Sequence, residues 1–211
     1  MTAIIVCSGS VIDYSYHKKY FNKAESVICV DGGAKHVRSF GLVPDVLIGD
    51  LDSISEEDLE YFKSLNVKIM KYQSEKDMTD TEIAVDFAIE SGYTEIVIIG
   101  GIGTRIDHSL ANIFLLKRML DRGIKGLIVN EQNEIRLIKD RISVMREEGS
   151  KITLLPLTNL VEGITTKGLY YELNNEAIEM GSSRGVSNEF SADAAEVTIE
   201  SGILIVIKSR D

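Results

Sequence analysis

Up to about residue 130, short β-branched apolar runs alternate along the chain with stretches whose apolar residues recur at helical spacing. We expect strands at residues 3–7, 26–30, 46–49, 67–72, 95–99 and 126–129. Alternation of this kind is typical of βαβ units, whose strands form a parallel sheet. The pattern therefore predicts an α/β domain with a Rossmann-like parallel sheet over residues 1–132.

The helices between these strands carry recognisable start and stop signals. Ser55 precedes three acidic residues, and Thr79 followed by Glu82 has the spacing of a capping box. We expect Thr79 to open a helix that reaches about Ser91. Another helix is expected over residues 108–122, ended by Gly123, with apolar positions at Leu110, Ile113, Phe114 and Leu120.

Beyond residue 133 the pattern changes to alternation of apolar and polar residues, as in residues 151–154 and 196–199. Turn-forming pairs, Asn174-Asn175 and Ser201-Gly202, separate such runs. Residues 133–211 are therefore expected to form a small antiparallel β domain with a sandwich-like arrangement. So small a unit gains stability by packing on the first domain or on a second copy, and we expect dimerisation through it.

Charge and composition narrow the class of partner. The 211 residues carry a formal net charge of -10 and no run rich in lysine and arginine, which argues against a nucleic acid or an anionic membrane surface. A small molecule is the better expectation, and a polyanionic one would need local cations or a bound metal. No apolar stretch approaches the roughly 18 to 20 residues that span a bilayer, and no basic leader precedes the first strand. We expect a cytoplasmic protein.

The cysteines and histidines of this chain are not spaced as the ligands of a zinc site. Cys7 and Cys29 both lie in apolar, strand-like runs and are expected to be buried free thiols. The three histidines show no zinc-ligand spacing with either cysteine. A structural zinc site is therefore not predicted.

Polar or glycine-rich segments follow the predicted strands, and in an open parallel sheet ligands bind at that carboxyl edge. These segments are residues 8–10, 31–33, 49–53, 76–80, 100–108 and Asn130. Four of them carry aspartates, and crowded carboxylates repel one another unless a cation compensates them. Asp50 and Asp52 would face the same side if the backbone there is extended. Magnesium prefers such oxygen ligands, so we expect a magnesium site here.

Each motif also has a purely structural interpretation. The segment at Asp52-Ser53 can be a turn that leads into a helix cap, and Asp77 and Asp80 can stabilise a helix N-terminus. His108, at a helix start, can be structural in the same way. The Gly100–Gly103 loop matches neither the Walker P-loop nor the dinucleotide fingerprint, although its N–H groups can approach phosphate.

Taken together, the motifs resemble those of thiamine pyrophosphokinases in order and spacing. The segments that carry the resemblance are 31–34, 44–53, 76–80 and 104–108, followed by 168–171, 181–185 and 187–190. The resemblance covers nearly the whole chain. It implies transfer of the pyrophosphoryl group of ATP to the hydroxyethyl oxygen of thiamine, with Mg²⁺, to give thiamine diphosphate and AMP.

The resemblance also assigns residues. The expected magnesium ligands are Asp50, Asp52, Asp77 and Asp107. Lys76 and Arg105 are expected to contact the ATP phosphates, in a nucleotide cleft shaped by Asp31, Gly32, Gly33, Gly101, His108 and Asn112. Thiamine is expected to meet Asp80, Ser187, Asn188 and Phe190. For Asp80 two roles stay open, a hydrogen bond to the aminopyrimidine or orientation of the hydroxyl; for Phe190, ring stacking and plain core packing stay open.

The resemblance further implies a homodimer that holds thiamine where subunits meet, with Asp80 of one chain and Ser187 of the other in each site. Two other functions remain open. A pyrophosphokinase for another small alcohol, such as a pterin, would share the ATP and metal loops, although residues 187–190 favour thiamine. A non-catalytic thiamine or nucleotide sensor would keep the pocket, but the retained aspartates argue against it.

Overall fold

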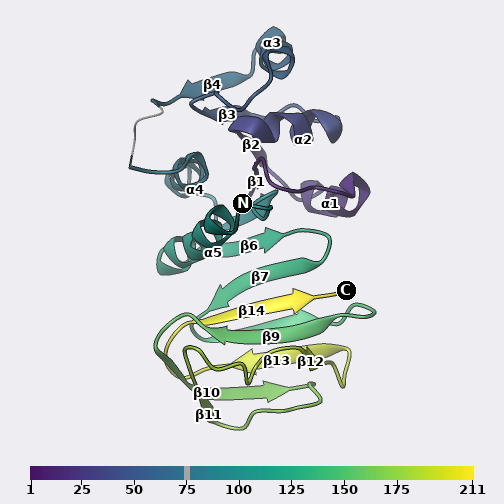
Figure 1. Ribbon diagram of the computed structural model, residues 1–211, viewed down its shortest axis with the longest axis vertical. Helices are drawn as coiled ribbons and strands as arrows, with labels where there is room; N and C mark the ends of the chain where they lie inside the picture. The colour runs from purple at the N-terminus through teal and green to yellow at the C-terminus, as the bar shows by residue number, and fades with distance from the viewer. Residues whose placement is uncertain (74–76) are drawn as a thin grey trace. The chain divides into compact units, whose positions relative to one another are not determined.

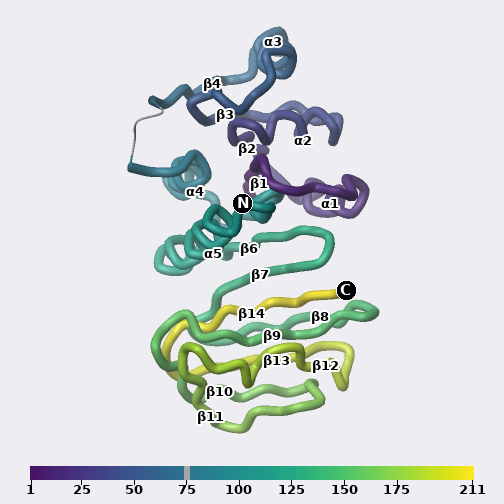
Figure 2. Tube along the Cα trace, in the orientation of Figure 1, coloured from purple at the N-terminus to yellow at the C-terminus, as the bar shows by residue number. Residues whose placement is uncertain are grey.

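The structure is a computed structural model that describes residues 1–73 and 77–211 of the 211-residue chain. It divides into two compact units, Met1–Glu131 and Gln132–Asp211. Figures 1 and 2 label the elements along the chain. Each unit is described here by itself.

The first unit is built on a parallel sheet with strand order β6-β5-β1-β2-β3-β4. Every predicted strand is confirmed to within one residue at each end. The elements in chain order are β1 (Thr2–Val6), α1 (Tyr14–Phe21), β2 (Ser26–Val30), η1 (Asp31–Gly33), α2 (Ala34–Ser39), β3 (Val46–Gly49), α3 (Glu56–Ser64), β4 (Lys68–Lys71), α4 (Asp80–Glu90), β5 (Glu95–Ile99), α5 (Ile106–Asp121) and β6 (Lys125–Val129).

Helices cover both faces of this sheet, as Figure 1 shows for α1 and α2 against α4 and α5. Successive side chains of a strand point to opposite faces, so a central strand covered on both sides must be apolar throughout. In β1 every residue from Ala3 to Val6 is fully buried. Ile4 and Val6 belong to a cluster with Val37 and Phe40 near α2, and the intervening Ile5 faces the other layer. This arrangement leaves the strand ends free to carry polar loops.

The predicted helix starts are confirmed by cap hydrogen bonds. Ser55 Oγ accepts from the N–H of Asp58 at 3.1 Å and caps α3. Thr79 Oγ1 accepts from the N–H of Glu82 at 3.2 Å and caps α4, which ends at Glu90 with Ser91 as its C-cap. These bonds satisfy N–H groups that have no partner inside the helix. Asp80 is thereby fixed as the first residue of α4.

Helix α5 differs from its prediction in start and in orientation. It begins at Ile106 rather than at residue 108, and it buries Asn112, Leu116 and Met119. Two residues expected on its apolar face, Leu110 and Phe114, are 47% and 54% exposed. Gly126 on β6 contributes to this packing, because a Cβ there would come within 2.7 Å of both Leu116 Cδ2 and Met119 Sδ. The missing side chain of Gly126 therefore lets Leu116 and Met119 pack closely on β6.

The second unit is antiparallel throughout, as the alternating pattern predicts. Its two sheets have the strand orders β12-β9-β14-β7 and β11-β10-β13-β8. The strands are β7 (Asn133–Ile138), β8 (Arg141–Met145), β9 (Lys151–Pro156), β10 (Leu160–Lys167), β11 (Glu176–Glu179), β12 (Asn188–Glu189), β13 (Ala194–Thr198) and β14 (Leu204–Ser209).

One apolar core joins both sheets of the second unit. It contains Ile152 and Val206 from the first sheet and Val161 and Val197 from the second, each at most 2% exposed. Two sheets that share a core through alternating side chains form a sandwich-like layer pair. The predicted fold class is confirmed.

The expectation for the two cysteines is also met in the described part of the chain. Cys7 and Cys29 are free and buried, and burial raises the pKa of the Cys7 thiol to about 12. Neither thiol is a reactive nucleophile in such surroundings. Among the described residues, no helix is both long and apolar enough to cross a membrane.

Candidate active site

Three aspartates meet where β2 and β3 end. Asp31 directly follows β2, whereas Asp50 and Asp52 follow β3, and one carboxylate oxygen from each lies within 4.8 Å of the others. The backbone that brings them together is not extended. Asp31 has φ 44° and Leu51 has φ 71°, in the left-handed region. An extended backbone, the condition under which Asp50 and Asp52 would share a side by strand alternation, is therefore not what the structure has at Leu51.

A turn brings these side chains together instead. Asp50 Oδ1 accepts from the N–H of Asp52 at 3.1 Å, which closes an Asx turn. The structural interpretation of this segment, a turn into the cap of α3, is therefore correct. It is also compatible with a site, because the same turn places both carboxylates beside Asp31.

Asp31 is the buried member of this acid cluster, with 9% exposure. Its Oδ2 accepts a hydrogen bond from Ser53 Oγ, but its Oδ1 has no partner among residues 1–73 and 77–211. Burial raises the pKa of Asp31, and the charges of Asp50 and Asp80 raise it further, while the bond from Ser53 acts in the opposite direction. A carboxylate that is buried, crowded and half-satisfied is one that a cation would stabilise.

Asp52 is exposed, yet its pKa is raised in the same direction as that of Asp31. Its hydrogen bond with Asp50, the Coulomb repulsion of that residue and the charges of Asp31 and Asp80 raise the pKa of Asp52. The acid cluster thus offers oxygen donors from two strand ends, with one buried oxygen that no group in the described part of the chain satisfies. This donor set fits a hard divalent cation such as Mg²⁺.

Glycine at position 49 makes room for Asp31. Gly49 has φ 154°, and a Cβ there would lie 3.0 Å from Asp31 Cβ and 3.2 Å from Asp31 Cγ. Two glycines that were predicted to shape the nucleotide cleft, Gly33 and Gly101, are required by packing alone. A Cβ on Gly33 would come within 2.2 Å of the carbonyl oxygen of Val6, and one on Gly101 within 2.8 Å of Ile98 Cγ2. Contact with a nucleotide is therefore not needed to explain those two glycines.

Two side chains of α5 hold the loop that follows β5. Asn112 Nδ2 donates to the carbonyl oxygen of Gly101 at 2.7 Å, and Ser109 Oγ accepts from the N–H of Gly103 at 3.1 Å. Asn112 is buried, with 8% exposure, so its side chain supports the loop from inside the fold. This fixes the segment that leads to Arg105.

Arg105 and Asp107 form an exposed ion pair at the start of α5. Arg105 Nη2 lies 2.6 Å from Asp107 Oδ2, and the two side chains are 69% and 65% exposed. The hydrogen bond from Arg105 lowers the pKa of Asp107 to about 2. Asp107 is thus ionised and already paired, and the neighbouring His108 is exposed.

In the second unit, Asn188 organises the segment predicted for thiamine. Its Nδ2 donates to the carbonyl oxygen of Tyr171 at 2.7 Å, and its Oδ1 accepts from the N–H of Tyr171 at 3.0 Å. The Tyr170 and Tyr171 rings lie 4.9 Å apart and are 69% and 68% exposed as residues. Ser187, which precedes Asn188 in the chain, is exposed and adopts φ 58°.

Phe190 belongs to the core of this unit. It is 9% exposed and packs in the apolar cluster between the two sheets. The core-packing interpretation of this residue is therefore the one that the structure supports. The exposed aromatic rings of the region are those of Tyr170 and Tyr171.

Comparison with known proteins adds two family models that together span most of the chain. Residues 17–128 match the model "Thiamin pyrophosphokinase, catalytic domain", and residues 139–204 match "Thiamin pyrophosphokinase, vitamin B1 binding domain". The chain belongs to the thiamine pyrophosphokinase family. The resemblance seen in the sequence motifs is confirmed.

Individual relatives agree with this family. The thiamine pyrophosphokinase of Bacillus subtilis (strain 168) is 33% identical over 186 residues, which cover 87% of each chain. The crystal structure of thiamine pyrophosphokinase from Bacillus subtilis superposes with a TM-score of 0.92 at 32% identity, covering all of both chains. That from Geobacillus thermodenitrificans has a TM-score of 0.86 at 30% identity, covering 100% of this chain and 98% of its own.

Within this thiamine pyrophosphokinase fold, the predicted site residues divide into groups. Asp50 and Asp52 stand in the acid cluster, and Asp80 reaches it through its charge. Asp77 and Asp107 are described but do not belong to the cluster, and Lys76 lies outside the described residues. Their predicted roles stay predictions.

The structure brings Asp31 and Ser53 together beside Asp50 and Asp52, an arrangement that the sequence analysis did not predict. Asp31 was assigned to the nucleotide cleft rather than to the metal, and Ser53 was interpreted only as a turn residue. The available signal was that Asp31 follows a buried strand directly, as Asp50 also does. The pairing of β2 with β3 was needed to show that these strand ends are neighbours.

Proposed function

We propose that this chain transfers the pyrophosphoryl group of ATP to the hydroxyl oxygen of thiamine, giving thiamine diphosphate and AMP. The observation that carries the proposal is the acid cluster at the carboxyl edge of the parallel sheet, in a chain that matches both thiamine pyrophosphokinase models. In the reaction, the hydroxyl oxygen forms a bond to the β-phosphorus, the bond to the oxygen shared with the α-phosphate breaks, and the hydroxyl proton is released.

Asp31, Asp50 and Asp52 are the residues that would hold Mg²⁺. The unsatisfied Oδ1 of Asp31 and the raised pKa values of Asp31 and Asp52 support this assignment. Bound there, Mg²⁺ would neutralise charge on the ATP phosphates and polarise the β-phosphoryl group. Asp77 and Asp107 remain proposed further ligands.

The protein's own part is to bind and orient. Arg105, already charged and exposed at the start of α5, donates hydrogen bonds to ATP phosphates in exchange for its bond to Asp107. Lys76 is proposed to add a second cation there. Asp80, in the first turn of α4, faces thiamine, the substrate that receives the pyrophosphoryl group, and accepts a hydrogen bond from it.

For thiamine, we propose a surface on the second unit. The Ser187 hydroxyl is exposed, and the adjacent Tyr170 and Tyr171 rings present faces that attract a thiazolium cation. Asn188 uses both ends of its amide on the backbone of Tyr171, so it holds this surface in shape. Phe190 supports it from the core.

We further propose that two copies assemble into a homodimer in the cytoplasm and that each site combines Asp80 of one chain with Ser187 of the other. Mixing inactive Asp80→Ala and Ser187→Ala chains would then restore part of the activity. Failure of the mixture to exceed the sum of its parts, with dimers present by sedimentation, would exclude shared sites.

The deciding experiment supplies purified protein with ATP, Mg²⁺ and thiamine and separates AMP from ADP. We expect AMP in proportion to thiamine diphosphate. ADP as the sole nucleotide product would overturn the pyrophosphoryl assignment. Turnover with a pterin alcohol but not with thiamine would show that the pterin alcohol is the substrate that receives the pyrophosphoryl group. Binding of thiamine without turnover would indicate a sensor.

A matched pair of variants connects this activity to the acid cluster. Asp50→Asn removes one charge from the cluster and is expected to reduce turnover greatly while the fold is kept. Asp45→Asn removes one charge at the amino end of the same strand, where the side chain only accepts from the N–H of Val27 at 2.8 Å, and should retain turnover. Equal turnover in both variants would remove Asp50 from the site.

A further inference from the structure

The loop between β1 and α1, residues 8–13, is bound to the loop that follows β5. The N–H of Gly9 donates to the carbonyl oxygen of Gly100 at 2.8 Å, and that of Ser10 to Ile102 at 2.9 Å. A Cβ on Gly9 would lie 2.4 Å from the carbonyl oxygen of Gly100, so the two backbones touch. The position of the 8–13 loop therefore fixes the position of residues 100–102, which lead to Arg105.

The same loop also touches the segment that carries the acid cluster. A Cβ on Gly32 would lie 3.2 Å from Ser8 Cβ and 3.0 Å from Ser53 Oγ, so Gly32 lies between these two side chains. Gly32 N–H donates to Ser53 Oγ at 3.1 Å, and that hydroxyl in turn donates to Asp31. The 8–13 loop is thus in contact with both halves of the proposed ATP and metal site.

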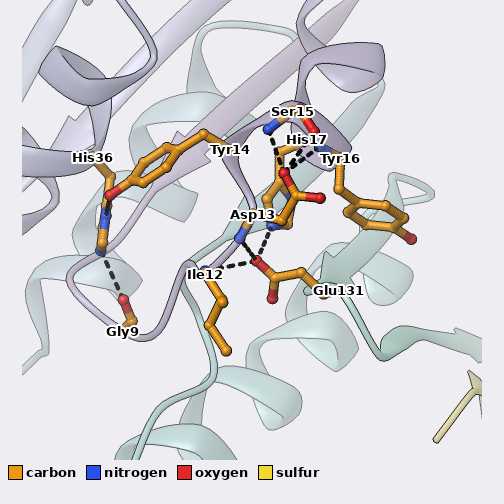
Figure 3. Close-up of polar contacts among 9 residues, drawn as sticks. All are labelled: Gly9, Ile12, Asp13, Tyr14, Ser15, Tyr16, His17, His36 and Glu131. Carbon is orange, nitrogen blue, oxygen red and sulfur yellow. Dashed lines mark hydrogen bonds and ion pairs between the residues drawn. The ribbon is translucent and has the colours of Figure 1, made fainter.

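One buried histidine anchors this loop from the α2 side, as Figure 3 shows. His36 Nε2 lies 2.8 Å from the carbonyl oxygen of Gly9, which can only accept, so Nε2 carries the proton. His36 Nδ1 therefore accepts from the hydroxyl of Tyr14, also at 2.8 Å. His36 is 5% exposed, and burial lowers its pKa, so the ring is neutral and held in one tautomer at pH 7.

A second anchor holds the other end of the loop. Glu131 Oε1 accepts from the N–H of Ile12 at 2.7 Å and from that of Asp13 at 2.8 Å. The same oxygen lies 3.2 Å from Nε2 of His17, which is completely buried. Figure 3 shows these three contacts converging on one carboxylate. Both ends of the 8–13 loop are therefore tied to groups far away in the sequence.

We propose that His36 and Glu131 are positioning residues for the nucleotide, and that the loop they clamp keeps Arg105 and the acid cluster aligned on the same ATP molecule. This inference rests on the proposed function. Neither side chain touches the reacting atoms; both act through the 8–13 loop. The catalytic family model matches residues 17–128, so His36 lies inside it, whereas residues 8–13, Tyr14 and Glu131 lie outside it.

The test compares graded variants of the clamp by steady-state kinetics, with KM for ATP and KM for thiamine measured separately. Tyr14→Phe removes only the hydroxyl that fixes His36, and it should raise the KM for ATP about three- to tenfold, the range that one lost hydrogen bond produces. The KM for thiamine should stay unchanged. Glu131→Gln, which keeps the shape but weakens three hydrogen bonds, should act in the same direction.

Rescue by a conservative variant separates positioning from plain stability. His36→Ala removes the bond to Gly9, whereas the amide of His36→Gln can still donate to it, so His36→Gln should regain most of the affinity for ATP that His36→Ala loses. Tyr61→Phe is the matched control. Tyr61 lies on α3, where its ring stacks against the guanidinium of Arg38, and its variant should keep both KM values.

Several outcomes would overturn the proposal. Tyr14→Phe with an unchanged KM for ATP, equal increases in both KM values, or a lower melting temperature as the sole effect would each reduce the clamp to a structural feature. If the wild-type protein forms no AMP, the proposed function fails, but calorimetric titration of wild type and Tyr14→Phe with Mg²⁺ and ATP still tests the clamp. Equal affinities there would reject it.

Discussion

Replacing Asp31 by asparagine should make the metal-free protein more stable and at the same time abolish its response to magnesium. Asp31 is nearly buried, its Oδ1 has no hydrogen-bond partner among the described residues, and it lies within 4.8 Å of a carboxylate oxygen of Asp50. The asparagine oxygen can still accept from Ser53 Oγ, as Asp31 Oδ2 does. The new NH₂ group would donate to the neighbouring carboxylates instead of repelling them.

The magnitude follows from that separation. Two unit charges 4.8 Å apart repel by about 1 kcal/mol at the dielectric constant of water and by about 3 kcal/mol at an effective value of ~20. The bond from Ser53 becomes weaker by about 1 kcal/mol, because its acceptor is no longer charged. The free energy of unfolding should therefore rise by about 1 kcal/mol, which is about 2–4 °C in melting temperature for a chain of this size.

With Mg²⁺ bound, wild type should melt at a higher temperature than Asp31→Asn, the reverse of their order without metal. A ligand present at about one hundred times its dissociation constant stabilises the folded state by about 2.7 kcal/mol. Wild type should show this gain, whereas Asp31→Asn should show little, because it has lost the buried donor of the acid cluster. Thermal melts in EDTA and in Mg²⁺, without substrates, measure both effects.

The control for this experiment is Asp45→Asn, which makes the same change in net charge at the opposite end of β3. It should melt like wild type in both buffers. A variant Asp31→Asn that melts at or below the wild-type temperature in EDTA, or that keeps the full magnesium shift, would refute the reasoning about the acid cluster.

Three further predictions follow from single contacts. Gly49→Ala should cost about 1–3 kcal/mol of stability and most of the magnesium shift, because its Cβ would press on Asp31 from a backbone with φ 154°; circular dichroism melts in both buffers check this. Acidification from pH 7 to pH 5.5 should lower the melting temperature, because burial lowers the pKa values of His17 and His36, so the unfolded chain binds protons that the folded chain does not; the drop should be smaller in His36→Gln, and an equal drop would contradict this. Asn188→Ala should raise the KM for thiamine severalfold and leave the KM for ATP unchanged, since it frees the loop that carries the exposed tyrosines.

Much of the first unit is determined locally by the sequence. The alternation of apolar runs with helical stretches predicts the strands, because a strand covered on both faces must be apolar at every position. The starts of α3 and α4 are equally local, since Ser55 and Thr79 cap groups only three residues away. The change to period-two alternation after residue 133 likewise predicts the antiparallel second unit.

The arrangement of the site depends on contacts between residues that are distant in the chain. Asp31 joins Asp50 and Asp52 only because β2 pairs with β3 and because the backbone turns left-handed at Asp31 and Leu51, which an extended-strand pattern does not predict. Helix α5 buries Leu116 and Met119, which pack closely on Gly126 of β6, and the spacing of apolar residues did not predict this face.

The clamp shows the same division most clearly. His17 and Glu131 are 114 positions apart, yet they meet in one buried hydrogen bond, and the same carboxylate also holds the 8–13 loop. Nothing in the local sequence around either residue indicates the other, because a hydrogen bond between them requires the whole sheet to be assembled first. The sequence by itself determined the elements, the fold class and the kind of chemistry; the tertiary structure decided which carboxylates meet and what holds their loops in place.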